Sequence, residues 1–234
     1  MSLRPELKID WATYEAAKYA VEHWHYSKTM PMPPVLKLGA WEAGEFIGVV
    51  LFSRGASPHL GDAYNLNNIQ VCELTRIALK NHFTPVSRMI AVSVRILKIR
   101  ESNLRLVVSF ADPNEGHHGG IYQAAGWLYS GQTAEKFDFL GPDGKRYRDR
   151  QVTMSGKARQ FGKMTKVYRV SDCTPIPLKP KHRYLMPLDK EMRKQIEPLR
   201  KPYPKKIASE AGDDRDHRNS GGAEPTRTLQ KENK

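Results

Sequence analysis

The amino-acid sequence predicts an α/β protein with one mixed, mostly antiparallel sheet flanked by helices on both faces. Three observations lead to this expectation. Amphipathic helical patterns alternate with short apolar strand patterns over about the first 130 residues. One strand pattern, 104–110, is apolar throughout, which is typical of a strand buried on both faces. The 234 residues suffice for one compact domain with appendages.

The N-terminal part predicts a helix followed by a hairpin. Asp10 is a helix-capping residue, and apolar side chains recur at helical spacing after it, so we expect a helix over 11–26. The prolines of the segment MPMPP cannot continue this helix. Two strand patterns, Val35 to Trp41 and Phe46 to Ser53, then predict an antiparallel hairpin joined by a short turn.

The middle of the chain predicts two further strand and helix pairs. Residues 71–79 alternate as a strand, and the threonine and proline at 84–85 begin a helix by the N-cap and first-turn rules. The apolar strand 104–110 follows. A short helix after the glycines near residue 120 and a last strand over 127–130 complete the series.

The charge of the chain is unevenly distributed. The formal net charge is +13, yet residues 1–144 carry 14 basic and 14 acidic side chains. Residues 145–206 carry a net charge of +14, which accounts for the whole excess. This concentration indicates a polyanionic partner and favours nucleic acid. The candidate nucleic-acid contacts are Lys145, Arg146, Arg148, Arg150, Lys157, Arg159, Lys163 and Lys166.

The composition also excludes several classes of protein. The apolar run Phe46 to Phe52 is far shorter than the roughly 20 residues of a membrane-spanning helix. The N-terminal segment MSLRPELKID lacks the apolar region of a signal peptide. Two isolated cysteines, Cys72 and Cys173, build neither a zinc finger nor a disulfide framework. We therefore expect a cytoplasmic protein that does not bind membranes.

Three regions follow from these patterns. We expect a catalytic domain over 1–170, with the near-neutral core 1–144 inside it, and a basic, proline-rich, nucleic-acid-binding extension over 171–206. Residues 207–234 are polar and lack aromatic side chains, so we expect a disordered tail. On this division, truncation after Val170 weakens nucleic-acid binding and its salt dependence and leaves the core folded.

Two resemblances to known families add to this interpretation. The strand CELTRIAL, the helix that begins at Thr84 and the segments LRLVVSFAD and GGIYQAAGW resemble the core of the GNAT acyltransferases, in which two strands splay around an acyl donor. A closer resemblance, over about the first 130 residues, is to the Mom-type phage DNA modification proteins. It rests on the segments SLRPELKIDWA, HWHYSKTMPMPP, GVVLFSRGASP, CELTRIAL, TPVSR and SFADPNEGHHGGIYQAAGW.

The second resemblance implies a function. It implies an enzyme that converts the exocyclic amine of adenine in double-stranded DNA to a carbamoylmethyl (glycinamide) derivative, which protects the DNA from restriction endonucleases in the bacterial cytoplasm. Two alternatives stay open: an acyl-CoA-dependent N-acyltransferase for a small molecule or a protein, and a non-catalytic nucleic-acid-binding protein on a GNAT-like scaffold. GNAT domains often pair, which leaves a homodimer open as well.

The donor site departs from the GNAT pattern. GNAT proteins hold the coenzyme A pyrophosphate in a glycine-rich loop at a helix N-terminus, but residues 81–88 contain no glycine. Either Thr84, Ser87 and Arg88 replace this loop and hold acetyl-coenzyme A, or the donor is glycyl-tRNA, which supplies an activated two-carbon unit with its nitrogen. A tRNA would then be a second partner. Gly119 and Gly120 give the backbone freedom that close approach to a donor requires.

Four residues are candidates for catalysis. Asp112 follows the buried strand, and Phe110 and Pro113 beside it should partly desolvate its carboxyl group, which would tune it towards a general base for the adenine amine. Its alternative role is to cap the following turn. By resemblance to GNAT enzymes, Tyr122 is a candidate general acid, or else an ordinary core aromatic. Arg76 either positions a phosphate or forms a salt bridge. Ser87 completes the set beside the donor.

The histidines suggest a metal site. His25, Tyr26 and His118 are of metal-ligand type, and the resemblance to the Mom-type proteins implies iron. The alternative is that these histidines are hydrogen-bonded parts of the fold. An adenine must also leave the duplex before its amine can react, and Trp24, Tyr26 and Trp127 are candidates for stacking on the extruded base.

Overall fold

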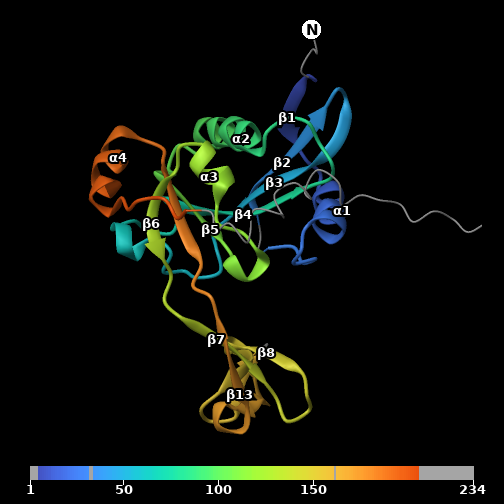
Figure 1. The fold of residues 1–234 in the computed structure, drawn as a ribbon, viewed down its shortest axis with the longest axis vertical. Helices are drawn as coiled ribbons and strands as arrows, with labels where there is room; N and C mark the ends of the chain where they lie inside the picture. Colours follow the sequence, from blue (N-terminus) through green and yellow to red (C-terminus); the bar gives the residue numbers. More distant parts are fainter. Residues whose placement is uncertain (1–4, 32–33, 161, 206–234) are drawn as a thin grey trace, which may run out of the picture. The chain divides into compact units, whose positions relative to one another are not determined.

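The structure is a computed structural model that describes residues 5–31, 34–160 and 162–205, so the expected tail at 207–234 lies outside the described residues. The chain divides into two compact units, with the boundary between Leu104 and Arg105. Both units combine helices with mostly antiparallel strands (Figure 1). The α/β class expected from the sequence is therefore confirmed. Within the described residues, none of the helices has the length and apolar character needed to cross a membrane.

The first unit contains four consecutive antiparallel strands, each paired with the next. The expected hairpin is confirmed, and its turn contains Ala43 and Gly44, whose φ angles of 50° and 84° suit a tight turn between twisted strands. The strands are β1 (Leu7–Trp11), β2 (Pro34–Glu42), β3 (Glu45–Ser53) and β4 (Val71–Leu79).

Two helices, α1 (Tyr14–Trp24) and α2 (Val86–Arg100), pack on this sheet through separate apolar clusters. Ala17, Ala20 and Val21 of α1 pack with Val49, Leu51 and Ala78. Met89 of α2 packs with Ala40 and Ile47. The pairing of β2 with β3 is irregular next to Gly48, and this bulge lets Ile47 and Val49 join different clusters although they are two residues apart.

The starts of both helices differ from the sequence prediction. Asp10 does not cap α1, because it lies in β1 opposite Gly39. Thr13 is the cap instead, and its hydroxyl accepts a hydrogen bond from the amide of Ala16 at 3.1 Å. Pro85 rather than Thr84 precedes the first residue of α2. The edge strand β1 thus includes the expected cap, Asp10, and the first expected helical residue, Trp11.

The second unit is built around a three-stranded sheet in which the last strand lies between the other two. Tyr184 and Leu185 of this central strand are fully buried, as is Trp127. The buried strand expected near 104–110 is confirmed. The strands are β5 (Leu106–Ala111), β14 (His182–Pro187) and β6 (Leu128–Gln132), and β14 is antiparallel to both neighbours.

Further elements of this unit are short. Its helices are α3 (Gly120–Ala124) and α4 (Lys190–Ile196). A second sheet contains β7 (Lys136–Leu140), β8 (Arg146–Arg148) and β13 (Thr174–Leu178), all labelled in Figure 1. Two pairs of strands complete it: β9 (Val152–Thr153) with β12 (Tyr168–Arg169), and β10 (Lys157–Gln160) with β11 (Lys163–Lys166). Single 3-10 turns occur at Asp62–Tyr64, Pro113–Glu115, Asp149–Gln151, Val170–Asp172 and Glu197–Leu199.

The stretch 171–206, expected as an appended basic extension, contributes β13, β14 and α4 to the second unit. The prolines of β13 are tolerated because this strand is at the edge of its sheet. Since β14 pairs with both β5 and β6, truncation after Val170 would remove a strand from the middle of this sheet, which argues against the expectation that it leaves the core folded.

Candidate functional site

A cluster of polar side chains surrounds Asp112 at the end of β5 in the second unit. His182 pairs with Ala111 in the sheet, so Lys181, one residue earlier, comes beside Asp112. The Lys181 Nζ lies 2.6 Å from Asp112 Oδ2. Asn114 donates to Asp112 Oδ1 from its backbone amide at 3.0 Å and from its side chain at 2.8 Å. We call Asp112, Asn114 and Lys181 the Asp112 cluster.

Asn114 also joins this cluster to the segment before β14. Its side-chain amide donates to the carbonyl of Lys179 at 3.1 Å, and its Oδ1 accepts from the amide of Lys179 at 3.0 Å. Two chain segments far apart in sequence are thereby held at a fixed distance. The carboxylate of Asp112 is preorganised by Asn114, whose side chain is itself held by Lys179.

The charges of the cluster decide what Asp112 can do. Burial alone raises the pKa of this carboxyl, but the hydrogen bonds from Lys181 and Asn114 and the charge of Lys181 outweigh it, so the pKa lies below the ordinary 3.8. Asp112 is therefore ionised at neutral pH. The tuning towards a general base with a raised pKa, expected from the sequence, is wrong, whereas the expected turn-capping role is confirmed.

Lys181 is the member of this cluster that sequence reasoning missed. It stands in a run of basic and proline residues, and nothing in its local pattern differs from that of its neighbours. Only the pairing of β14 with β5 brings it to Asp112.

The pair of Tyr129 and His182 was missed for the same reason, because it joins β6 to β14. The Tyr129 hydroxyl lies 3.0 Å from His182 Nδ1, and burial raises the pKa of Tyr129.

Tyr122 lies in the core of the second unit, and its side chain is only 7% exposed. Ser109 donates a hydrogen bond of 2.8 Å to its hydroxyl. Its ring packs against Trp127 and Tyr184, each at 5.2 Å between centroids. This geometry supports the core role that the sequence left as the alternative to a general acid. Trp127 is itself fully buried, so stacking of an extruded base on it is wrong.

The glycines before α3 are explained by packing. Gly119 has a φ of 88°, and a Cβ atom there would come within 2.2 Å of the Tyr184 ring. The Tyr184 hydroxyl donates to the carbonyl of His118 at 2.7 Å and accepts from Gln123 at 3.0 Å. A Cβ on Gly120 would lie 3.0 Å from His118 Nε2. The contact of Gly119 with Tyr184 accounts for that glycine without a donor.

A carboxylate already occupies the loop before α2, where a donor phosphate is expected. Glu42 accepts hydrogen bonds from the amides of Thr84 at 2.6 Å and Phe83 at 2.8 Å. Partial burial raises the pKa of Glu42, but these bonds and one from the Thr84 hydroxyl bring it below the ordinary 4.5. Thr84, expected to bind a donor phosphate, is therefore engaged by Glu42 through both its amide and its hydroxyl. Ser87 and Arg88, the other two residues expected to hold the donor, lie in the first turn of α2, and Arg88 is exposed.

A pyrophosphate does not fit at the amides of Phe83 and Thr84 as the loop stands, because the negative charge of Glu42 lies there. The same carboxylate explains how the loop is stable without glycine. It accepts hydrogen bonds from amides that would otherwise need a capping side chain or an anion.

Arg76 lies on β4, and its guanidinium group donates to backbone carbonyls. It contacts the carbonyl of Thr75 at 2.7 Å and that of Thr29 at 3.4 Å. The second contact ties the segment after α1 to the sheet. None of the ion pairs found in the described ranges involves Arg76, so the expected salt bridge is not observed in this part of the chain.

The residues expected to hold iron do not fit such a site. His25 is buried, and its Nδ1 lies 2.8 Å from the Ser27 hydroxyl and accepts from the Ser27 amide at 3.1 Å. Tyr26 packs against the His25 ring at 4.2 Å. The carbonyl of His118 accepts a hydrogen bond from the Tyr184 hydroxyl at 2.7 Å. Throughout the described residues, no three His, Cys, Asp or Glu side chains gather in a way that could hold a metal ion.

The eight basic residues expected to contact nucleic acid are all exposed. Arg146 forms an ion pair of 2.8 Å with Asp138, and Lys145 lies 4.0 Å from Asp143. The other six take part in none of the ion pairs found among the described residues. They lie on β8, β10 and β11 and in the turn after β8.

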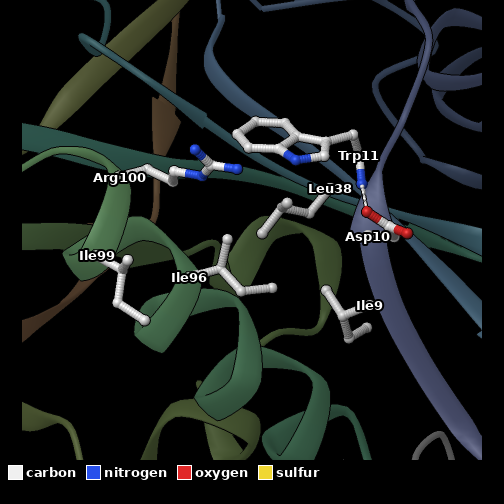
Figure 2. Close-up of a pocket in the computed structure, with 7 residues that line it drawn as sticks. All are labelled: Ile9, Asp10, Trp11, Leu38, Ile96, Ile99 and Arg100. Carbon is white, nitrogen blue, oxygen red and sulfur yellow. Dashed lines mark hydrogen bonds between the residues drawn. The ribbon is translucent and has the colours of Figure 1, made fainter.

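An open apolar pocket of about 260 Å³ lies in the first unit, between β1, β2 and α2 (Figure 2). The Arg100 guanidinium group covers the Trp11 ring at 5.1 Å. None of the residues expected to carry chemistry lines this pocket. Its lining residues are Ile9, Asp10, Trp11, Leu38, Ile96, Ile99 and Arg100.

Comparisons with known proteins identify the family. Among solved structures, an acetyltransferase of Bacillus subtilis in complex with CoA covers 79% of this chain and 99% of its own, at 14% identity and a TM-score of 0.43, which is too weak a likeness to indicate a donor. The methylcarbamoylase mom of Escherichia phage Mu is 25% identical over 207 residues, which are 86% of this chain and 84% of that protein. The model of the Mom protein family matches residues 6–205, and this chain therefore belongs to the Mom protein family.

Proposed function

We propose that this protein modifies DNA by converting the exocyclic amine of adenine to a carbamoylmethyl derivative, which protects phage DNA from restriction endonucleases. The observation that carries the proposal is the family match over residues 6–205, which includes the whole Asp112 cluster. The related protein of phage Mu is named a methylcarbamoylase, which supports the transfer of a small amide-containing group. Double-stranded DNA is the substrate, and the reaction is an acyl- or aminoacyl-type transfer.

The Asp112 cluster supplies suitable groups for this reaction. An ionised, preorganised carboxylate accepts a hydrogen bond from the adenine amine and orients it without fully removing a proton. The side chain of Lys181 is 44% exposed. Its positive charge could stabilise an oxyanion that forms during the reaction or bind a phosphate of the substrate. The imidazole of His182, the residue after Lys181, forms a second polar pair with the Tyr129 hydroxyl.

The donor is either acetyl-coenzyme A or glycyl-tRNA. Glu42 at the amides before α2 argues against a pyrophosphate in that loop, and an activated glycyl ester already contains the carbon and nitrogen atoms that the product needs. Acyl transfer to the adenine amine would release the tRNA hydroxyl. Attack of the glycyl amine on the ring carbon would then break the bond from that carbon to the original amine nitrogen, which becomes the amide nitrogen of the carbamoylmethyl group. A reconstitution distinguishes them: purified protein is incubated with duplex DNA and each donor alone, and the DNA is digested to nucleosides. Modified adenine formed with acetyl-coenzyme A as sole donor eliminates glycyl-tRNA.

Expression in a bacterium that carries a plasmid tests the function itself. Mass spectrometry of the plasmid nucleosides should show a mass shift on deoxyadenosine. D112N and K181Q should abolish the shift, whereas D143N, which alters a surface carboxylate paired with a lysine outside the cluster, should retain it. Unmodified plasmid DNA from cells with folded wild-type protein contradicts the proposal. Acyl transfer from acetyl-coenzyme A to other acceptors would then indicate the N-acyltransferase alternative.

A further inference from the structure

The hairpin formed by β10 and β11 is solvent-exposed and densely basic. Lys157 lies opposite Lys166 across the two strands, and Arg159 lies opposite Met164. All four residues of β11 are exposed, and Met164 is 65% exposed. We call Lys157, Arg159, Met164 and Lys166 the ribbon face, because residues directly opposite one another point to the same side of a hairpin.

The ribbon face is unfavourable for the protein by itself. Two lysines directly opposite each other repel, and in the described part of the chain no carboxylate forms an ion pair with Lys157, Arg159 or Lys166. The face also lacks apolar packing, since Met164 is its one described apolar side chain and is mostly exposed. A polyanion bound to this face would neutralise the repulsion between the lysines and form ion pairs with all three basic side chains.

We propose that this hairpin enters the major groove of the duplex DNA substrate, with the ribbon face towards the base edges. This rests on the proposed function, which makes duplex DNA the substrate. The major groove of B-DNA is about 12 Å wide and admits a two-stranded ribbon. Strands lie about 4.8 Å apart, so the long side chains of Lys157 and Lys166 reach the phosphates on both sides of the groove.

Arg159 and Met164 lie closer to the turn of the hairpin than the two lysines. In the groove they face the base edges, where arginine pairs with O6 and N7 of guanine and an apolar side chain contacts the methyl group of thymine. Lys157 and Lys166 provide sequence-independent affinity, whereas Arg159 and Met164 favour particular base pairs near the modified adenine.

Duplex DNA fits this hairpin better than RNA or a single strand. The major groove of A-form RNA is too deep and narrow for side chains to read. A single strand has no major groove for a two-stranded ribbon to enter. A tRNA donor, if one is used, would therefore bind elsewhere on the protein.

The test measures binding of the full-length protein to a labelled 20-base-pair duplex over a series of salt concentrations. Each phosphate contact changes the slope of log affinity against log salt by about 0.9, so K157Q/K166Q should lower the slope by about 2. K157R/K166R keeps both positive charges and should therefore show the slope of the wild type. K190Q/K194Q, which removes two exposed lysines of α4 in the same unit, should leave it unchanged.

Dimethyl sulfate footprinting locates the groove. Wild-type protein should protect guanine N7, in the major groove, and R159Q should lose this protection while K190Q/K194Q retains it. Circular dichroism checks that each variant is folded. An unchanged slope in K157Q/K166Q, an equal loss in K190Q/K194Q, absent N7 protection, or an equal loss of affinity for tRNA would each overturn the proposal.

The two proposals fail separately. Suppose that the triple variant K157Q/R159Q/K166Q binds duplex DNA as the wild type does and still modifies the plasmid adenine. In that case the hairpin is not the groove-binding element, and the proposed function stands. If the wild type protects N7 through Arg159 but the plasmid stays unmodified, the hairpin proposal stands and the function does not.

Discussion

At the scale of the residue, Lys181 changes the chemistry of Asp112. The sequence suggests a carboxyl group desolvated by Phe110 and Pro113, whereas the ammonium group 2.6 Å away keeps it ionised. An ionised carboxylate beside a lysine orients an amine and balances charge, but it is a weak proton acceptor. A step that needs a stronger base would use another group.

The lowered pKa of Asp112 predicts how stability depends on pH. The folded state holds the pKa below the ordinary 3.8, so the stabilisation by this carboxylate is present above that value and is lost as the pH falls through the folded pKa. D112N should therefore be less stable than the wild type at neutral pH, and the difference should shrink in acid. Urea unfolding at both pH values measures it, with E135Q, at an exposed position of the same unit, as the surface control.

Gly119 predicts a second effect on stability. In G119A, the added methyl group meets the Tyr184 ring, and the positive φ of 88° is strained as well. G126A has a similar φ of 74° but no atom within 4 Å of the new Cβ, so it isolates the backbone strain. We expect G119A to be less stable than G126A by about 1–3 kcal/mol, the typical effect of overpacking. Equal melting temperatures would contradict this explanation of Gly119.

At the scale of the element, β14 determines whether the second unit folds. Truncation after Val170 removes the strand that pairs with both β5 and β6, together with the buried Tyr184 and Leu185. We expect this truncation to abolish the cooperative unfolding of the second unit, measured by hydrogen exchange of β5 amides. Truncation after Lys205 keeps every described residue of this unit and should preserve that protection.

Local pattern was sufficient for some elements and insufficient for others. β2, β3, β4 and the apolar strand β5 follow from alternation and apolar runs, which are local signals. β14 was missed because its apolar centre, Tyr184 to Met186, is short and stands between basic and proline residues. Its strand conformation is stabilised by pairing with distant partners, a tertiary effect that local propensity does not report.

The candidate site shows the same limit. Asp112 could be found because it follows a predicted buried strand and carries the family resemblance. Lys181 could not, since about 70 residues separate it from Asp112 and only the sheet joins them. Glu42 was missed for a similar reason: it ends β2, and the two amides it accepts from are about 40 residues later.

At the scale of the whole molecule, the boundary in charge does not coincide with the boundary between the units. The basic excess begins at residue 145, whereas the second unit begins at Arg105 and also contains the Asp112 cluster. The candidate chemistry and the exposed basic residues therefore belong to one compact unit. The sequence, read by charge alone, assigned them to different parts of the protein.

This distribution predicts where salt-dependent binding originates. R148Q/R150Q, in the second unit, should lower the slope of log affinity for duplex DNA against log salt by about 2, because two phosphate contacts are lost. R95Q/K98Q removes the same charge from exposed positions on α2 of the first unit and should have no effect. Titrations at several salt concentrations measure both. A lower slope in R95Q/K98Q with no change in R148Q/R150Q would place the binding surface on the first unit.

The central position of β14 has a consequence for synthesis of the protein. Strand β5 leaves the ribosome about 70 residues before β14, and β6 about 50 residues before it, so both strands wait with an unpaired edge. An apolar strand with a free edge readily pairs with other chains. The second unit should therefore depend on chaperones, or on slow cell growth, more than its size suggests. Ribosome-bound chains arrested before His182 should be captured by a holdase chaperone, and chains arrested well beyond Lys205 should be released.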